Sequence, residues 1–258
     1  MNILKNYGAN CSLTRVSVSL YQDKEIIMTK KYLSGTIVAL LVLILFSSLN
    51  GKAQMVNEIA KKRVTIGVGM FTDIWFNMPT GIKTRTINQG FQTFVMYNVP
   101  FGKSNFGFAI GLGFRAQNLY GNFLVKSAQD STYLEKIGDT AAVNYQRSKL
   151  TLPYLEIPIE FRFKSKSKIA VGIGFKVAYL LPAHTKYVGQ DYTTLTGAKY
   201  RVKYREIKNL EQFSYGPTFR IGYRWFQFSA YYSISKAFTK GDGPDINSLS
   251  LGFLLMPF

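Results

Sequence analysis

Residues 106–117 read Phe-Gly-Phe-Ala-Ile-Gly-Leu-Gly-Phe-Arg-Ala-Gln, with a large apolar residue at every second position from Phe106 to Phe114. The intervening positions hold Gly and Ala, and then Arg115 and Gln117. Alternation with a period of two is typical of a β-strand whose two faces lie in different environments. This stretch therefore predicts a strand with one large apolar face and one small or polar face.

The same alternation recurs along the chain. The other segments that show it are residues 64–73, 91–99, 155–163, 169–179, 213–223, 226–234 and 248–255. A soluble barrel of the lipocalin kind, which is the alternative fold, would place the large residues inside. Here the second face is rich in Gly, Ala and Ser, which suits a crowded interior better than a solvent face. We therefore predict an all-β protein, an eight-stranded antiparallel up-and-down transmembrane β-barrel with its apolar face toward lipid.

The connections between these segments alternate in length. The short ones are residues 100–105, 164–168 and 224–225, and the long ones are 76–88, 121–148, 182–212 and 236–247. Outer-membrane barrels have short periplasmic turns and longer extracellular loops, so we expect the short connections in the periplasm. Aromatic residues near the segment ends are expected to form an interfacial girdle. They are Tyr97, Tyr120, Tyr154, Tyr179, Tyr223 and Trp225.

The N-terminal region predicts export. Two lysines follow Met28, residues 37–46 are an unbroken apolar run, and Gly51-Lys52-Ala53 comes shortly after. This is the pattern of a signal peptide cleaved after Ala53, and its apolar run is shorter than the roughly 20 residues of a spanning helix. We expect three parts. They are an upstream extension, misassigned or disordered, at 1–27, a signal peptide at 28–53 and the outer-membrane β-barrel at 54–258.

Composition excludes several other classes of protein. Charged residues make up 18 % of the 258 residues and aromatic residues 15 %, which is unlike a disordered chain. The single Cys, Cys11, cannot form a disulfide framework. Residues 1–53 hold six of the 32 Lys and Arg and two of the 14 acids, which leaves 26 against 12, a net charge of +14. For an exported barrel, this excess predicts phosphorylated outer-membrane lipid as the anionic partner rather than nucleic acid.

The chain ends at Phe258, and a terminal aromatic residue is the usual assembly signal of outer-membrane barrels. Leu249, Leu251 and Phe253 set the apolar face of the last segment, and Pro257 interrupts the alternation before Phe258. A bulge near Pro257 would restore the phase. We therefore interpret Phe258 as the assembly signal.

Charged residues also fall on the predicted lumen face. They are Asp73, Arg115, Glu156, Glu160, Arg162, Lys176, Arg220 and Arg224. They would form either a selective ion path or a network of salt bridges that plugs the barrel. We favour the plug, because buried charges must be paired and the lumen of an eight-stranded barrel has little spare room.

The long loop at 182–212 contains a basic and aromatic stretch. Lys199, Arg201, Lys203 and Arg205 share one face of a predicted strand extension above the membrane. This face would contact lipid phosphate or an envelope protein partner, and the alternative is a solvated hairpin face.

The sequence gives little sign of catalysis. The only His, His184, would need a nucleophile and a carboxylate beside it to serve a lipid A-modifying enzyme, and the candidates nearby are Thr185 and Asp191. Neither a metal-ligand spacing nor a phosphate-binding loop occurs. We expect no enzyme activity and no cofactor.

A resemblance to a known family rests on two adjoining segments. Residues 152–162 read Leu-Pro-Tyr-Leu-Glu-Ile-Pro-Ile-Glu-Phe-Arg, and Val-Gly-Ile-Gly-Phe follows at 171–175. Over roughly residues 60–258 the chain resembles the PorT-like outer-membrane β-barrel family of Bacteroidota. The resemblance implies a small integral barrel with a structural or interaction role. The family's namesake belongs to the type IX protein secretion machinery, so the resemblance implies an alternative role as a component of a type IX-like secretion machinery. A small-solute pore and a lipid A-modifying enzyme are less favoured alternatives.

Overall fold

The computed structural model describes residues 63–128, 131–137, 144–190 and 199–256. The predicted extension, the predicted signal peptide, residues 54–62 and Phe258, the predicted assembly signal, lie outside these ranges. Among the described residues, no helix is long and apolar enough to cross a membrane.

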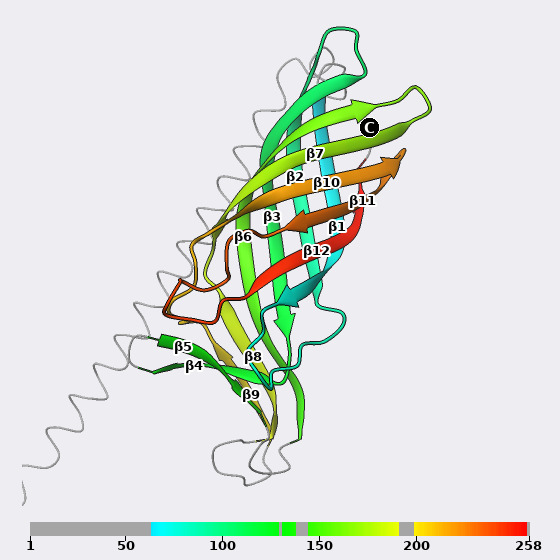
Figure 1. Ribbon diagram of the computed structural model, residues 1–258. Coiled ribbons are helices and arrows are strands. Elements are labelled where there is room, and N and C mark those ends of the chain that lie inside the picture. Colours follow the sequence, from blue (N-terminus) through cyan, green and yellow to red (C-terminus); the bar gives the residue numbers. More distant parts are fainter. Residues whose placement is uncertain (1–62, 129–130, 138–143, 191–198, 257–258) are drawn as a thin grey trace, which may run out of the picture. The chain divides into compact units, whose positions relative to one another are not determined.

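Eight strands form a closed antiparallel barrel (Figure 1). They are β1 (Val64–Phe76), β2 (Gln89–Pro100), β3 (Phe106–Tyr120), β6 (Tyr145–Lys164), β7 (Ile169–Leu180), β10 (Phe213–Tyr223), β11 (Phe226–Tyr232) and β12 (Asn247–Leu255). Each strand pairs with its neighbour in the order β3-β2-β1-β12-β11-β10-β7-β6, and the pairing of β3 with β6 closes the sheet. Because β12 also pairs with β1, the first and last strands meet. The predicted eight-stranded fold is confirmed.

The long connections contain four strands in addition to the eight of the barrel. β4 (Phe123–Ala128) and β5 (Ser131–Lys136) form a hairpin of their own, and β8 (His184–Gln190) and β9 (Lys199–Tyr204) form another. β8 pairs with the first part of β6, which begins ten residues before the predicted start of its segment. Of these four strands, the sequence predicts only β9, as the strand extension around residues 199–205. The remainder was missed because these strands lack a sustained apolar face.

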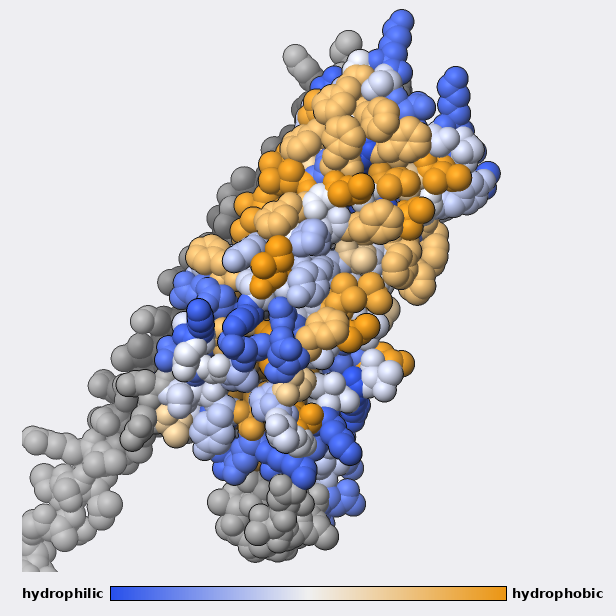
Figure 2. Space-filling model, in the orientation of Figure 1, coloured by the Kyte–Doolittle hydropathy of each residue, from blue (hydrophilic) through white to orange (hydrophobic). Residues whose placement is uncertain are grey.

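The outward face of the barrel is apolar. Figure 2 shows hydrophobic side chains gathered over the barrel strands and hydrophilic ones toward the end that carries β4, β5, β8 and β9. Met70, Leu112 and Ile173 are each more than 60 % exposed, although all three lie in the middle of strands. A soluble barrel would bury such side chains, so the lipid-facing arrangement holds.

The inward face is built from small residues that make space for rings. A Cβ atom on Gly67 would collide with the ring of Phe94, and one on Gly90 would collide with the ring of Phe71. Both rings are buried. The glycines of the lumen face therefore have a packing role, which is the usual reason for glycine within a strand.

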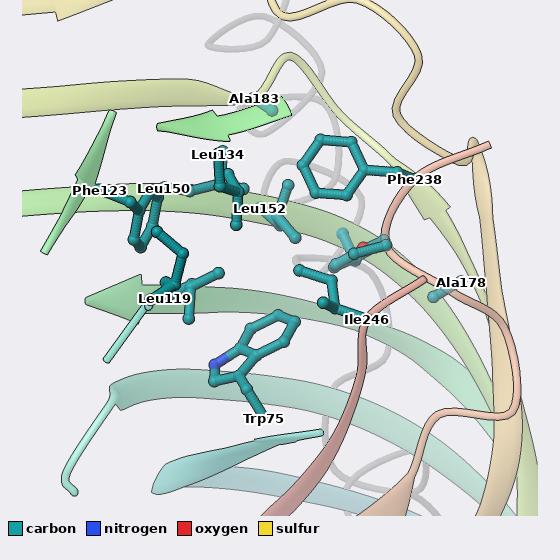
Figure 3. Packing of buried hydrophobic residues seen from close by; sticks show 13 residues of the cluster. Trp75, Leu119, Phe123, Leu134, Leu150, Leu152, Ala178, Ala183, Phe238 and Ile246 are labelled. Atoms are coloured by element: carbon teal, nitrogen blue, oxygen red, sulfur yellow. The ribbon is translucent and has the colours of Figure 1, made fainter. Parts of the chain in front are cut away.

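An apolar cluster fills the end of the lumen that lies beside the long connections (Figure 3). Its members include Trp75, Leu119, Leu150, Leu152 and Ile246, all buried. They come from the ends of β1, β3 and β6 and from the loop before β12. Since long connections are extracellular in this class of barrel, the cluster closes the extracellular end.

Candidate functional site

The middle of the lumen contains a buried charge cluster centred on Glu156. Its two carboxylate oxygens face two cations: Oε2 lies 3.3 Å from Arg115 Nε, and Oε1 accepts a hydrogen bond from Lys176 Nζ at 3.0 Å. Arg115, Glu156 and Lys176 come from the neighbouring strands β3, β6 and β7. The Arg115 guanidinium also lies over the rings of Tyr154 and Tyr231, at 4.8 and 4.6 Å from their centroids. Cation–π contacts of this kind are strongest where water is excluded.

Asp73 of β1 extends this cluster toward the extracellular side. Its Oδ1 accepts hydrogen bonds from Ser250 Oγ at 2.6 Å and from Gln117 Nε2 at 3.0 Å. Gln117 also donates to Ser248 Oγ, and Arg115 Nη1 donates to Gln117 Oε1 at 3.4 Å. Gln117 therefore links Asp73 to the Arg115 side of the cluster.

A second charge cluster lies nearer the short turns. Glu160 Oε2 accepts hydrogen bonds from two guanidinium groups, Arg162 Nε at 3.0 Å and Arg220 Nη2. Arg162 Nη1 also donates to Asn98 Oδ1 and, at 3.4 Å, to Thr65 Oγ1. Strands β1, β2, β6 and β10 all contribute to this layer.

The structure thus brings seven of the eight predicted lumen residues into two adjoining clusters. The exception is Arg224, which is exposed in the turn between β10 and β11, with φ 53° and its guanidinium over the Tyr223 ring. The prediction for Arg224 was wrong because the alternation of faces ends where the strand ends, so a turn residue has no face assigned by it.

Tyr154 also departs from its predicted position. It is buried in the lumen beneath Arg115, whereas Tyr97, Tyr179, Tyr223 and Trp225 are exposed as a girdle requires. Because β6 begins at Tyr145, Tyr154 lies within the strand, on the inward-facing set that also holds Glu156.

The two clusters leave little free space between them. The space in the middle of the lumen is about 30 Å³, which accommodates on the order of two waters, since one water needs about 10–15 Å³. The extracellular end above it is filled by the apolar cluster. The geometry is that of a plugged lumen.

A second charged feature lies on the outward face of the extracellular extension. Lys149 of β6 pairs directly with Lys186 of β8, which pairs directly with Lys203 of β9. Directly paired residues project to the same side of an antiparallel sheet. Three lysines therefore stand side by side across three strands.

Further cations share this side of the extension. Arg147 and Arg201 both pair with Val188, two residues further along β8, and Lys199 follows on β9. We call this surface the outer basic face and define it as Arg147, Lys149, Lys186, Lys199, Arg201 and Lys203. The predicted Lys199, Arg201 and Lys203 are exposed and belong to it, and Arg205 is exposed just beyond the end of β9. Arg147, Lys149 and Lys186 were missed, although the alternation in residues 184–188 could have indicated Lys186.

Burial first, and neighbouring positive charge second, lowers the pKa values of Lys149 and His184 at this face. Burial, followed by the charges of Arg147, Lys186 and Lys203, lowers the pKa of Lys149. Burial, followed by Lys203, Lys149, Arg205 and Lys186, lowers the pKa of His184. Lys149 Nζ donates to Asn118 Oδ1 at 2.9 Å and lies over the ring of Tyr120. Both of these partners are neutral groups.

His184 lies at the start of β8, opposite Thr151 of β6. Thr185, one of the two candidate neighbours, pairs with Leu150 and Tyr204, and the other, Asp191, lies outside the described residues. Within the described ranges, no group of three or more His, Cys, Asp or Glu side chains is placed to hold a metal ion.

Comparisons with known proteins place the chain in a family. Two crystal structures that it resembles are those of Ail, the attachment invasion locus protein of Yersinia pestis, one of them in complex with the heparin analogue sucrose octasulfate. Identity is 12 % to the complex and 13 % to the other structure. The matches cover 75 % of this chain and 97 % of each Ail chain, with TM-scores of 0.36 and 0.34. No curated protein matches the chain. Residues 46–239 match the family described as Outer membrane protein beta-barrel domain, so the chain belongs to this family and its place is the outer membrane.

Proposed function

We propose that this protein is a non-catalytic outer-membrane barrel with an interaction role, and that its outer basic face binds the phosphate groups of outer-leaflet lipid. The observation that carries the proposal is the row of Lys149, Lys186 and Lys203 across β6, β8 and β9. Because the lumen is plugged, the barrel is better suited to act as a rigid scaffold for this face than as a pore.

Like charges that stand directly opposite each other across strands are destabilising. Three lysines in a row make two such pairs, and the charges of Lys186 and Lys203 add to the effect of burial in lowering the pKa of Lys149. A ligand that carries several phosphates would offset this repulsion by lying against the row. The arrangement is therefore more consistent with a binding surface than with a merely solvated hairpin face.

The position of the face favours a lipid ligand over a distant protein partner. Lys149 lies on the outward side of β6, the side that carries Leu155, Ile157 and Ile159 lower in the same strand. The lipid-facing apolar surface thus continues upward into cations at the extracellular end, where phosphates of the outer leaflet lie. Each Lys or Arg near an anionic membrane surface contributes about 1 kcal/mol.

The absence of catalysis remains part of the proposal. A lipid-modifying site built on His184 would need a carboxylate to orient the imidazole. The charged groups that shift the pKa of His184 are Lys203, Lys149, Arg205 and Lys186, all cationic. Such surroundings suit phosphate binding better than general-base chemistry.

The finer assignment, to the PorT-like family and a secretion assembly, is a second proposal. The segment 152–162 that carries the resemblance places Tyr154, Glu156 and Glu160 in the lumen. The resemblance in this segment therefore supports a lumen plug in common with the PorT-like family. It does not identify a surface for docking a secretion partner. Purification from native membranes in mild detergent, with a tag after Gln54, tests this proposal. A partner at near-equal amount supports it, and recovery of the barrel alone contradicts it.

The lipid proposal is tested by titrating the purified barrel, in zwitterionic nanodiscs, with lipid A and with dephosphorylated lipid A. We expect lipid A alone to bind, with an affinity that falls as salt is added. Replacing Lys186 and Lys203 together by Gln should weaken binding at least about tenfold, from about 1 kcal/mol per charge.

The matched control replaces two exposed lysines in other extracellular loops, Lys83 and Lys240, by Gln. It removes the same charge and should change the affinity less than about twofold. An equal loss in both double variants would mean that only net charge matters and would contradict a specific outer basic face.

A further inference from the structure

A cavity of about 390 Å³ lies at the opposite, periplasmic end of the lumen. The short turns after β2 and β6 form part of its rim, and its wall includes Arg162, Arg220, Thr65 and Asn98. Above it, the cluster around Glu156 and the apolar cluster fill the lumen. The cavity is therefore a blind vestibule rather than the entrance to a channel.

Positive charge is in excess at this vestibule. In the middle of the lumen, the two acids Asp73 and Glu156 balance the two bases Arg115 and Lys176 at their formal charges. The wall residues Arg162 and Arg220 share one acid, Glu160, which lines the adjoining space in the middle of the lumen. This leaves one formal positive charge over at the vestibule. A buried charge without a counter-charge is destabilising, so an anion bound here would be favoured.

The two guanidinium groups also have donors without good acceptors. Arg220 Nη1 points at Met256 Sδ at 2.9 Å, and Arg162 Nη2 points at Met96 Sδ at 2.9 Å. A thioether sulfur is only a weak acceptor. Arg220 Nε is buried and has no hydrogen-bond partner in the described part of the chain. A buried hydrogen-bond donor without an acceptor costs free energy. A ligand that supplied oxygen acceptors to these donors would therefore bind favourably here.

We propose that this vestibule binds a small oxyanion, the phosphate or carboxylate group of a periplasmic solute, through Arg162 and Arg220. The planar guanidinium group matches both anions because it offers parallel N–H donors. The rim carries Lys164 and Lys166, which add to the positive potential at the mouth. This site is independent of the outer basic face, because the two lie at opposite ends of the barrel.

The first experiment titrates the full folded barrel, ¹⁵N-labelled at arginine and held in zwitterionic detergent, with inorganic phosphate, acetate or chloride. The signal followed is the Nε–H resonance of Arg220. We expect saturable shifts with phosphate or acetate, at concentrations where chloride of equal ionic strength causes none. Comparison of the phosphate and acetate curves identifies the preferred oxyanion.

Variants then distinguish binding in the vestibule from attraction by the net positive charge of the protein. Phosphate affinity is measured by calorimetry. Arg220→Gln should weaken binding at least about tenfold, the size expected for loss of a charged hydrogen bond. Glu160→Gln should strengthen it, because the excess positive charge grows. Lys103→Gln, in the same periplasmic turn region but outside the cavity wall, should leave the affinity within about twofold.

Gly172→Ala tests the space without changing any charge. A Cβ there would lie 3.6 Å from Glu160 Oε2 and 3.8 Å from Arg220 Nε, an ordinary contact that the fold tolerates. The added methyl group takes up space beside the unpartnered Arg220 Nε–H, so phosphate binding should weaken several-fold.

The proposal is overturned if no oxyanion shifts the Arg220 resonance, or if Lys103→Gln weakens binding as much as Arg220→Gln. If Arg220→Gln does not fold, Glu160→Gln and Gly172→Ala decide the question, since they must change the affinity in opposite directions. Unchanged affinity in both would equally overturn it.

Discussion

Gly67 and Phe94 are paired directly across β1 and β2, and the ring of Phe94 occupies the space that a side chain on Gly67 would need. Phe94 is buried on the lumen side, where it also lies against the guanidinium of Arg220 at 5.0 Å. The pair shows how this barrel fits large rings into a narrow lumen: a ring on one strand lies over a glycine on the next.

Gly67→Ala should therefore destabilise the barrel, by about 1–3 kcal/mol as is typical of overpacking. Urea-induced unfolding in lipid vesicles, followed by heat-modifiable electrophoretic mobility, measures the effect. Gly172→Ala is the matched control, because its Cβ meets neighbours only at 3.6 Å and beyond. Equal stability of Gly67→Ala and the unmodified protein would mean that Phe94 moves aside at little cost.

Glu156 is the only carboxylate that contacts both Arg115 and Lys176 among the described residues. Glu156→Gln should leave two buried cations with Asp73 as their one remaining acid and destabilise the barrel by about 3–5 kcal/mol. The same unfolding assay applies. Glu135→Gln, which removes the acid of the exposed pair Lys126–Glu135, should cost less than about 1 kcal/mol. A small effect of Glu156→Gln would show that water or ions reach the cluster.

Much of the barrel could be predicted because lipid and lumen impose opposite demands on alternate residues. Phe106, Ile110 and Leu112 are exposed and Arg115 is buried, as the period of two in β3 requires. Seven lumen charges could be placed for the same reason. The alternation says which face a residue takes, but it does not say which partners meet across the lumen. Glu160 forms salt bridges with both Arg162 and Arg220, and this pairing depends on the order and stagger of the strands.

The extracellular extension could be predicted only in part. β4, β5 and β8 have no continuous apolar face, because both faces of each strand mix polar with apolar residues and most positions are exposed or half-buried. The row formed by Lys149, Lys186 and Lys203 joins positions that lie far apart in the sequence. Such a row depends on strand register, which the composition of each segment does not determine.

The plug makes a prediction for electrical recordings. Because charge clusters and apolar side chains fill the lumen, the folded protein should give no conductance steps in planar bilayers. Folding of the same sample is checked by its heat-modifiable mobility. Regular steps that scale with protein concentration would contradict the plug and would support the small-solute pore.

The single histidine gives a direct measure of the potential at the outer basic face. Burial and the surrounding cations lower the pKa of His184 from its ordinary value of 6.5, so its proton NMR titration should have a midpoint below that value. Lys203→Gln removes the largest charge effect and should raise the midpoint toward 6.5, whereas Lys240→Gln should not move it. The chain holds one His, so an untagged sample gives one imidazole signal.

The sign of the linked stability change follows from the same lowered pKa. Below pH 6.5 the unfolded chain binds a proton at His184 before the folded chain does, so acidification should destabilise the folded extension until the folded pKa is reached. Hydrogen exchange of the amides in β8 and β9 should therefore be less protected at pH 5.5 than at pH 7.5, after correction for intrinsic rates. Lys203→Gln should reduce this difference, because it brings the folded pKa closer to the unfolded one. A midpoint above 6.5, or protection that increases on acidification, would mean that an acidic group lies close to His184 and that the face is not cationic where we place it.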